Sequence, residues 1–130
     1  MPVAIDQLIK TDVVYSPHFD FLKTKHQPRI LTIHDLSFIH YPHFFSRRQR
    51  WWHWLQKVPQ QIKQSSHIIT NSQYTKQNII ETLKISEKKI TVIYPGIDPE
   101  LKNNYGLNKN IQYPFLLYLG TIEPRKNINA

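Results

Sequence analysis

The sequence predicts an α/β fold with a parallel sheet, and three observations support this prediction. Short β-branched runs alternate with segments of helical periodicity, as in chains whose parallel strands are joined by right-handed crossovers. The run Pro114–Leu119 is apolar throughout, which is typical of a strand buried on both faces of such a sheet. The chain has 130 residues, of which 40% are hydrophobic and 12% aromatic, so it can form a sizeable core.

The first third of the chain predicts one weak helix and two strands. Val3–Ile9 has apolar residues at helical spacing, and Asp12–Tyr15 predicts a short strand that ends at a Ser-Pro step. Arg29–Ile33 predicts a stronger strand, because it is rich in β-branched residues. This strand places His34 and Asp35 at its carboxyl end.

The next segment predicts a loop and a long helix. The loop, Leu36–Phe45, is dense in His, Tyr and Phe, and Ser46 after it can cap a helix that runs from Arg47 to about Ser65. Pro59 should kink or interrupt this helix. On a helical wheel, five apolar residues share one face and are expected to pack under the sheet. They are Trp51, Trp54, Leu55, Val58 and Ile62.

Two further strands frame a capped helix. His67–Thr70 predicts a short strand, and Asn71 with Ser72 provides the cap of a helix that continues through Lys84. Ser86–Lys89 predicts one more helical turn, and Ile90–Tyr94 predicts the following strand. These elements continue the alternation that a parallel α/β sheet requires.

The end of the chain predicts a linker and the start of an anion-binding unit. Half of the residues from Ile97 to Gln112 are Asn, Lys, Pro or Gly, which suits a linker. The final apolar strand is followed by Gly120 and then by the basic pair Arg125 and Lys126. A strand, a glycine and a basic turn form the opening half of a βαβ unit, which binds anions outside the carboxyl end of its strand.

Charge and composition narrow the class of protein. The formal net charge is +8, which favours anionic partners: nucleic acid, acidic lipid headgroups or a phosphorylated substrate. The absence of cysteine excludes disulfides and suits a reducing compartment, so we expect a cytoplasmic protein. Residues 1–11 lack the long apolar region of a signal peptide, and no apolar run approaches the roughly 20 residues that span a bilayer.

Four sequence blocks resemble one enzyme family in order and spacing. They are Thr32–Ser37, His67–Lys76, Val92–Asp98 and Leu119–Asn127. Together they cover nearly the whole chain and are similar to the retaining glycosyltransferases of family 4, in particular to its mannosyltransferase-like branch. The resemblance implies a GT-B fold, in which two Rossmann-like domains face each other across a cleft.

The resemblance also implies a domain organisation. Residues 1–95 correspond to the second half of the N-terminal, acceptor-side domain, residues 96–112 to the interdomain linker, and residues 113–130 to the start of the C-terminal domain that binds the nucleotide sugar. We expect a fragment, inactive alone, because the family's glycine-rich acceptor loop and Glu-x7-Glu segment have no counterpart in this sequence.

Two residues are expected to be catalytic by this resemblance. His34 would face the cleft near the donor sugar, and Lys126 would contact the diphosphate. Gly120, Thr121 and Arg125 would complete the diphosphate site, although many relatives carry arginine where this chain has Thr121. Simpler interpretations stay open. Arg125 and Lys126 could be an exposed cationic pair at the start of a helix, and His34 with Asp35 could form a plain hydrogen-bonded turn.

Four more residues are assigned supporting roles by the resemblance. Asp35 and Ser72 would line the cleft or the acceptor site, although Ser72 together with Thr75 also suits a plain helix cap. Gly96 and Asp98 match the linker block and would form the hinge for domain closure.

The reaction implied is transfer of a hexosyl group, for instance mannosyl, from a nucleoside-diphosphate sugar to a glycan or lipid-linked acceptor. No metal or other cofactor is expected, and His40 and His43 lack the accompanying ligands of a metal site. Peripheral contact with the membrane is compatible with the composition, whereas nucleic acid is the less expected partner. The alternative is a basic nucleic-acid- or membrane-surface-binding module that uses Arg47–Trp54, which would need exposed tryptophan rings.

Overall fold

The computed structural model describes residues 4–20, 23–99, 114–123 and 126–128. The chain divides into two compact units, Met1–Tyr94 and Pro95–Ala130, and each is described here by itself. The strands and helices named below all belong to the first unit. The candidate residues of the first unit therefore lie on a folded scaffold.

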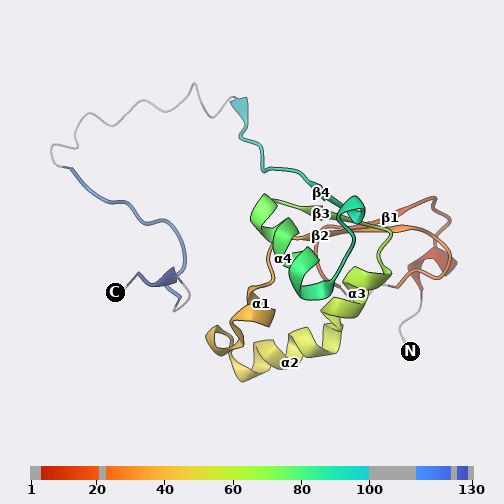
Figure 1. Cartoon of the computed structure of the whole chain (residues 1–130), viewed down its shortest axis with the longest axis horizontal. Helices are drawn as coiled ribbons and strands as arrows, with labels where there is room; N and C mark the ends of the chain where they lie inside the picture. Colours follow the sequence, from red (N-terminus) through yellow and green to blue (C-terminus); the bar gives the residue numbers. More distant parts are fainter. Residues whose placement is uncertain (1–3, 21–22, 100–113, 124–125, 129–130) are drawn as a thin grey trace. The chain divides into compact units, whose positions relative to one another are not determined.

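A four-stranded parallel sheet forms the centre of the first unit (Figure 1). Its strands are β1 (Val14–Ser16), β2 (Arg29–Ile33), β3 (His67–Thr70) and β4 (Ile90–Val92), and they lie in this order across the sheet. Ile68 of β3 pairs with Leu31 of β2 on one side and with Ile90 of β4 on the other. The predicted parallel α/β sheet is confirmed.

The helices lie between the strands in the chain and on one side of the sheet (Figure 1). They are α1 (Ser37–His40), α2 (Arg47–Gln56), α3 (Val58–Gln64) and α4 (Gln73–Leu83), with short 3-10 turns η1 (Ile5–Gln7), η2 (Pro42–Phe44) and η3 (Glu87–Lys89). Right-handed crossovers that step in one direction across a sheet place their helices on one face. This arrangement leaves the carboxyl ends of the strands as a common edge.

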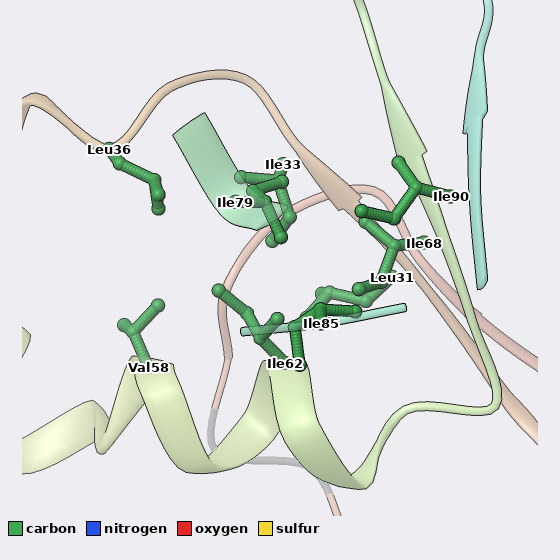
Figure 2. Close-up of a cluster of buried hydrophobic side chains, with 9 residues drawn as sticks. All are labelled: Leu31, Ile33, Leu36, Val58, Ile62, Ile68, Ile79, Ile85 and Ile90. Atoms are coloured by element: carbon green, nitrogen blue, oxygen red, sulfur yellow. The ribbon is translucent and has the colours of Figure 1, made fainter. Parts of the chain in front are cut away.

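Aliphatic side chains from the sheet and from α3 and α4 form the core (Figure 2). Figure 2 shows Val58 and Ile62 of α3 pointing toward the strand residues. The cluster consists of Leu31, Ile33, Leu36, Val58, Ile62, Ile68, Ile79, Ile85 and Ile90. Burial of each such side chain contributes about 1.5–3 kcal/mol, so this cluster holds the helices to the sheet.

The predicted helix caps are confirmed. The Ser46 hydroxyl accepts from the Gln49 amide, and the Gln49 side chain accepts from the Ser46 amide, which completes a capping box at the start of α2. The Ser72 hydroxyl accepts from the Thr75 amide at the start of α4. Both caps are local features, and a serine before an apolar helical pattern is enough to predict them.

The predicted long helix is two helices. The chain breaks at Lys57, whose φ of 49° is left-handed, and α3 starts at Val58. Pro59 has no amide hydrogen to donate to the Leu55 carbonyl, and its ring would collide with that carbonyl in a continuous helix. The predicted interruption is therefore confirmed, and it separates residues 47–56 from the face that α3 buries.

The tryptophans are not under the sheet, and that prediction was wrong. Trp51 is 59% exposed and Trp54 is 70% exposed, while Val58 and Ile62 are fully buried. The helical wheel assumed one helix, but the left-handed residue Lys57 changes the direction of the chain between the two groups. The buried residue of α2 is Gln56 instead.

Four more predicted elements of the first unit need correction. The predicted amphipathic helix Val3–Ile9 is, in its described part, only the 3-10 turn η1 at Ile5–Gln7, and Asp6 accepts hydrogen bonds from the amides of residues 25–27. The loop Leu36–Phe45 contains α1 and η2. The strands predicted at Asp12–Tyr15 and Ile90–Tyr94 exist with shifted or shorter bounds.

The apolar run at the end of the chain is not a buried strand. Residues 114–119 have no regular secondary structure, and Leu117 and Leu119 are 79% and 93% exposed. No strand among the described residues pairs with this run. A strand needs neighbouring strands to bond its backbone and to bury its side chains, and composition alone does not provide them.

Candidate active site

The carboxyl ends of β1, β2 and β3 bring polar side chains to one edge of the sheet. β1 leads into Pro17 and His18, β2 leads into His34 and Asp35, and β3 leads to the cap residue Ser72. Open α/β sheets bind their ligands outside this edge. It is therefore the candidate active site of the first unit.

His34 is exposed at the centre of this edge. Its Nε2 lies 3.3 Å from the carbonyl oxygen of Pro17, so that nitrogen can donate to the loop after β1. The ring of His18 lies with its centroid 6.3 Å from the His34 ring and tilted by 36°. If Nε2 carries the hydrogen in this contact, the opposite ring nitrogen, Nδ1, is an acceptor in the neutral imidazole.

A chain of two hydroxyl groups holds the backbone of His34. The buried Thr75 hydroxyl donates to the His34 carbonyl at 3.1 Å, and the Ser72 hydroxyl donates to Thr75 Oγ1 at 3.0 Å. Ser72 Oγ also accepts from the Thr75 amide at 3.1 Å. The cap of α4 is thereby joined to the end of β2, 41 residues earlier in the chain.

The carboxylate of Asp35 accepts hydrogen bonds from the first residue of α1. Its Oδ1 accepts from the Ser37 amide at 2.8 Å and also from the Ser37 hydroxyl. A carboxylate bonded in this way orients the local backbone, as an Asx turn does. In this geometry Asp35 shapes the loop beside His34.

His18 is a site residue that sequence reasoning missed. It lies in a polar connection without a periodic pattern, and its neighbours Ser16 and Pro17 indicated only the end of a strand. The available signal was its position two residues after β1, at the same sheet edge as His34. The sequence alone did not predict that the two rings approach each other.

Two other histidines sit away from this edge cluster. His40 Nε2 lies 3.2 Å from the Thr82 hydroxyl of α4, and the His43 ring lies against Phe44 with centroids 4.2 Å apart. In the described part of the chain, His, Asp and Glu side chains do not gather in groups of three that could hold a metal ion. That the reaction needs no metal stays a prediction.

The second unit places Lys126 beside Gly120. Gly120 has a φ of 152°, which favours glycine, and a Cβ added there would lie 3.1 Å from Lys126 Nζ. The ammonium group also lies 5.8 Å from the centre of the Tyr118 ring. Thr121 bonds within the same turn, its hydroxyl to Glu123 at 2.6 Å and its carbonyl to the Tyr118 hydroxyl at 2.6 Å. Arg125 lies outside the described residues.

The remaining candidates are in the exposed segment after β4. A Cβ added at Gly96 would meet no atom within 4 Å, so local packing does not require glycine there. Asp98 is exposed, and most of the predicted linker beyond it, residues 100–112, lies outside the described residues. His34 and Lys126 belong to different units, so their meeting across one cleft stays a prediction.

Comparison with known proteins defines the class of this chain. The family model Glycosyltransferase Family 4 matches residues 3–101, and the chain belongs to that family. This membership and the parallel sheet confirm the predicted Rossmann-like class and are consistent with part of a GT-B fold.

A curated relative is the O-antigen chain mannosyltransferase RfbU of Salmonella typhimurium (strain LT2), which is 28% identical over 100 residues. The match covers 77% of this chain and 26% of RfbU, so the chain spans about a quarter of the length of that relative. None of the helices in the described ranges has the length and apolar character needed to cross a bilayer.

Proposed function

We propose that this chain forms the acceptor-side part of a retaining hexosyltransferase that uses a nucleoside-diphosphate sugar. One observation carries the proposal: within a family 4 chain, His34 stands exposed at the carboxyl edge of the sheet, with its backbone fixed by Thr75. An exposed imidazole on a fixed backbone can hydrogen-bond a sugar hydroxyl with little loss of side-chain freedom. The mannosyl group is the first candidate for transfer, because RfbU is named a mannosyltransferase.

The chemistry assigns different tasks to the two units. Transfer breaks the anomeric C–O bond, and the electron pair leaves with the nucleoside diphosphate, which gains negative charge. Lys126 and the backbone at Gly120 would stabilise that charge more strongly in the transition state than in the ground state. Arg125 and Thr121 would bind the same diphosphate. The proposed reaction requires no bound metal ion.

His34 would act on the sugar side of the reaction. Its ring would position the donor hexose. The acceptor oxygen would form its bond to the anomeric carbon on the face from which the diphosphate departs, so the anomeric configuration is retained, and the leaving phosphate oxygen would accept the proton of the acceptor hydroxyl. Asp35, whose carboxylate is taken up by Ser37, would line the cleft and not serve as a base. The paired carboxylates used by most glycosidases are therefore absent from this scheme.

Acceptor and domain motion complete the proposal. The acceptor would be a glycan or a lipid-linked glycan, held partly by the edge near Ser72, at the cytoplasmic face of the membrane. Residues 113–130 would begin the donor domain, and the exposed segment at Gly96 and Asp98 would be the hinge that closes it onto the first domain.

The test is sugar transfer by the full-length protein that carries this chain. Release of nucleoside diphosphate is measured for GDP-mannose and UDP-glucose in the presence of a lipid-linked glycan acceptor. Lys126→Met should reduce kcat by about 10²–10³. His34→Gln should reduce it by about 10² or more. The matched control is His67→Gln, because His67 begins β3 at the opposite edge and bonds only Thr91 among the contacts described.

Two results would overturn the proposal. If His34→Gln and His67→Gln retain equal turnover, His34 has no role in transfer. If the wild-type protein releases no nucleoside diphosphate from either donor, although far-UV circular dichroism shows it folded, the donor class is wrong.

A further inference from the structure

Helix α2 presents an aromatic and basic surface that the core does not use. Trp51, Trp52 and Trp54 are 59%, 48% and 70% exposed. Arg47, Arg48 and Arg50 of the same helix are exposed as well. We call these six residues the α2 surface.

The α2 surface is a consequence of how α2 is attached. Its inner side consists of Gln56, which is buried, and His53, whose ring stacks on Phe38 with centroids 4.6 Å apart. On a helical wheel Trp51 and Trp54 lie opposite this inner side, with Arg47 between them and Arg50 next to Trp54. Indole and guanidinium groups therefore share the outward face of the helix.

The aromatic character extends beyond the helix. Tyr41 and Phe44, next to it in the chain, are also exposed. A groove of about 450 Å³ is lined by Trp54, Phe38 and Pro42, and also by Arg50. The exposed aromatic area is thus larger than one helix face.

The stretch of sequence that contains the α2 surface carries charge of a single sign. No acidic residue occurs between Asp35 and Glu81, a stretch that includes α1, α2 and α3 and most of α4. The basic residues of this stretch are Arg47, Arg48, Arg50, Lys57, Lys63 and Lys76. A helix face that carries cations and no carboxylate of its own is complementary to a dense layer of anions.

We propose that the α2 surface seats the protein on the headgroup layer of an anionic membrane. Tryptophan prefers the boundary between headgroups and hydrocarbon, and arginine can extend to the lipid phosphates from the same depth. α2 has 10 residues, too few to span a bilayer, so it lies in the plane of the interface. This inference does not depend on the proposed reaction.

Nucleic acid is the less suitable occupant. Single strands are bound by a basic groove that follows the backbone, with aromatic rings spaced for successive bases. The α2 surface is a convex helix face in which Trp51 and Trp54 lie on adjacent turns, and the area exposed in its groove is mostly apolar. The exposed aromatic area favours a partner that also accepts apolar groups.

The test is co-sedimentation of the chain with lipid vesicles. One vesicle type is phosphatidylcholine alone, and the other contains equal parts of phosphatidylcholine and phosphatidylglycerol. The chain should bind the anionic vesicles at least tenfold more tightly, with a blue shift of tryptophan emission. R47Q/R48Q/R50Q should weaken binding by about a hundredfold, since each arginine contributes about fivefold. W51S/W54S should weaken it by tenfold or more.

A charge-matched control separates this surface from general attraction. K63Q/K84Q/K88Q removes the same charge from exposed positions outside α2 and should bind at least tenfold more tightly than R47Q/R48Q/R50Q. All the substituted side chains are exposed, so far-UV circular dichroism should show each variant folded.

Four results would overturn the proposal. Equal binding to both vesicle types would contradict the role of lipid charge. Equal losses in the arginine and lysine variants would contradict the location. Unchanged binding by W51S/W54S, with tight binding of poly(U), would assign the surface to nucleic acid. A dimer in sedimentation velocity that W51S/W54S abolishes, without vesicle binding, would assign it to a second copy of the chain.

Discussion

The link between α4 and the candidate active site can be tested at one hydroxyl. Thr75 is 4% exposed, and its Oγ1 donates to the His34 carbonyl and accepts from Ser72. Thr75→Val keeps the shape and removes both side-chain bonds. The helix cap survives, because the Thr75 amide still donates to Ser72 Oγ.

The loss of stability expected for Thr75→Val depends on whether Ser72 and the His34 carbonyl can form other hydrogen bonds. Ser72 is half-buried and can bond to water instead, so losing its hydrogen bond to Thr75 costs little stability. The His34 carbonyl faces the new methyl group and loses a buried donor, which costs about 1–2 kcal/mol. For a unit of this size, each kcal/mol lowers Tm by about 4–8 °C.

Urea unfolding followed by far-UV circular dichroism measures this cost. Tryptophan fluorescence is the weaker probe, because Trp51 and Trp54 are already exposed in the folded state. Thr91→Val is the matched control: Thr91 is exposed, its hydroxyl bonds only a His67 ring nitrogen, and the change should stay within about 0.5 kcal/mol. Thr75→Ser keeps the hydroxyl and should leave the His34 amide chemical shift near its wild-type value.

Equal stability of the Thr75→Val and Thr91→Val proteins would refute this reasoning. The hydrogen bond from Thr75 to the His34 carbonyl would then contribute nothing measurable, and α4 would not be the element that positions His34.

Three further predictions concern the core, a helix end and pH. Ile68→Val should lower the free energy of unfolding by about 0.5–1.5 kcal/mol in urea titrations, since Ile68 is fully buried between two strands. Lys84→Gly should raise it by about 0.5–1 kcal/mol, because Lys84 ends α4 at a left-handed φ of 55°, whereas Lys63→Gly inside α3 should lower it. Burial, and to a smaller extent the charge of His18, lowers the pKa of His53 below 6.5, so the unfolded chain binds the proton more readily. Stability should therefore fall as pH drops through about 6.5, and His53→Phe should flatten that slope in Tm measured from pH 7.5 to 5.5.

The fold was predictable where local signals decide the structure. Strand Arg29–Ile33 and the caps Ser46 and Ser72 depend on residue type and position over a few residues, and all three are as predicted. The alternation of strands and helices then determines a parallel sheet through the geometry of crossovers. Predictions at this level needed no knowledge of distant contacts.

The wrong predictions have two causes. One helical pattern was extended across a break in the helix, and one predicted strand lacks neighbouring strands to pair with. The helical wheel joined Trp51 to Val58 across Lys57, and the left-handed φ there separates their directions. The run Pro114–Leu119 has the composition of a buried strand, but burial requires neighbours that composition does not supply.

The candidate site was predictable in part for the same reason. His34 follows a strong strand, so its place at the carboxyl edge followed from the sequence. The contacts of His34 with Pro17 and Thr75, and the nearby His18, join segments 16 to 41 residues apart. No local pattern carries that information.

The most direct test of the account is a double-mutant cycle between His34 and Lys126 in the full-length protein, measured as kcat for nucleoside-diphosphate release. If both residues act on one transition state, His34→Gln and Lys126→Met together should cost clearly less than the product of their separate effects. Strictly multiplicative losses, or full turnover in either single variant, would contradict a shared site for the sheet edge and the Gly120 turn.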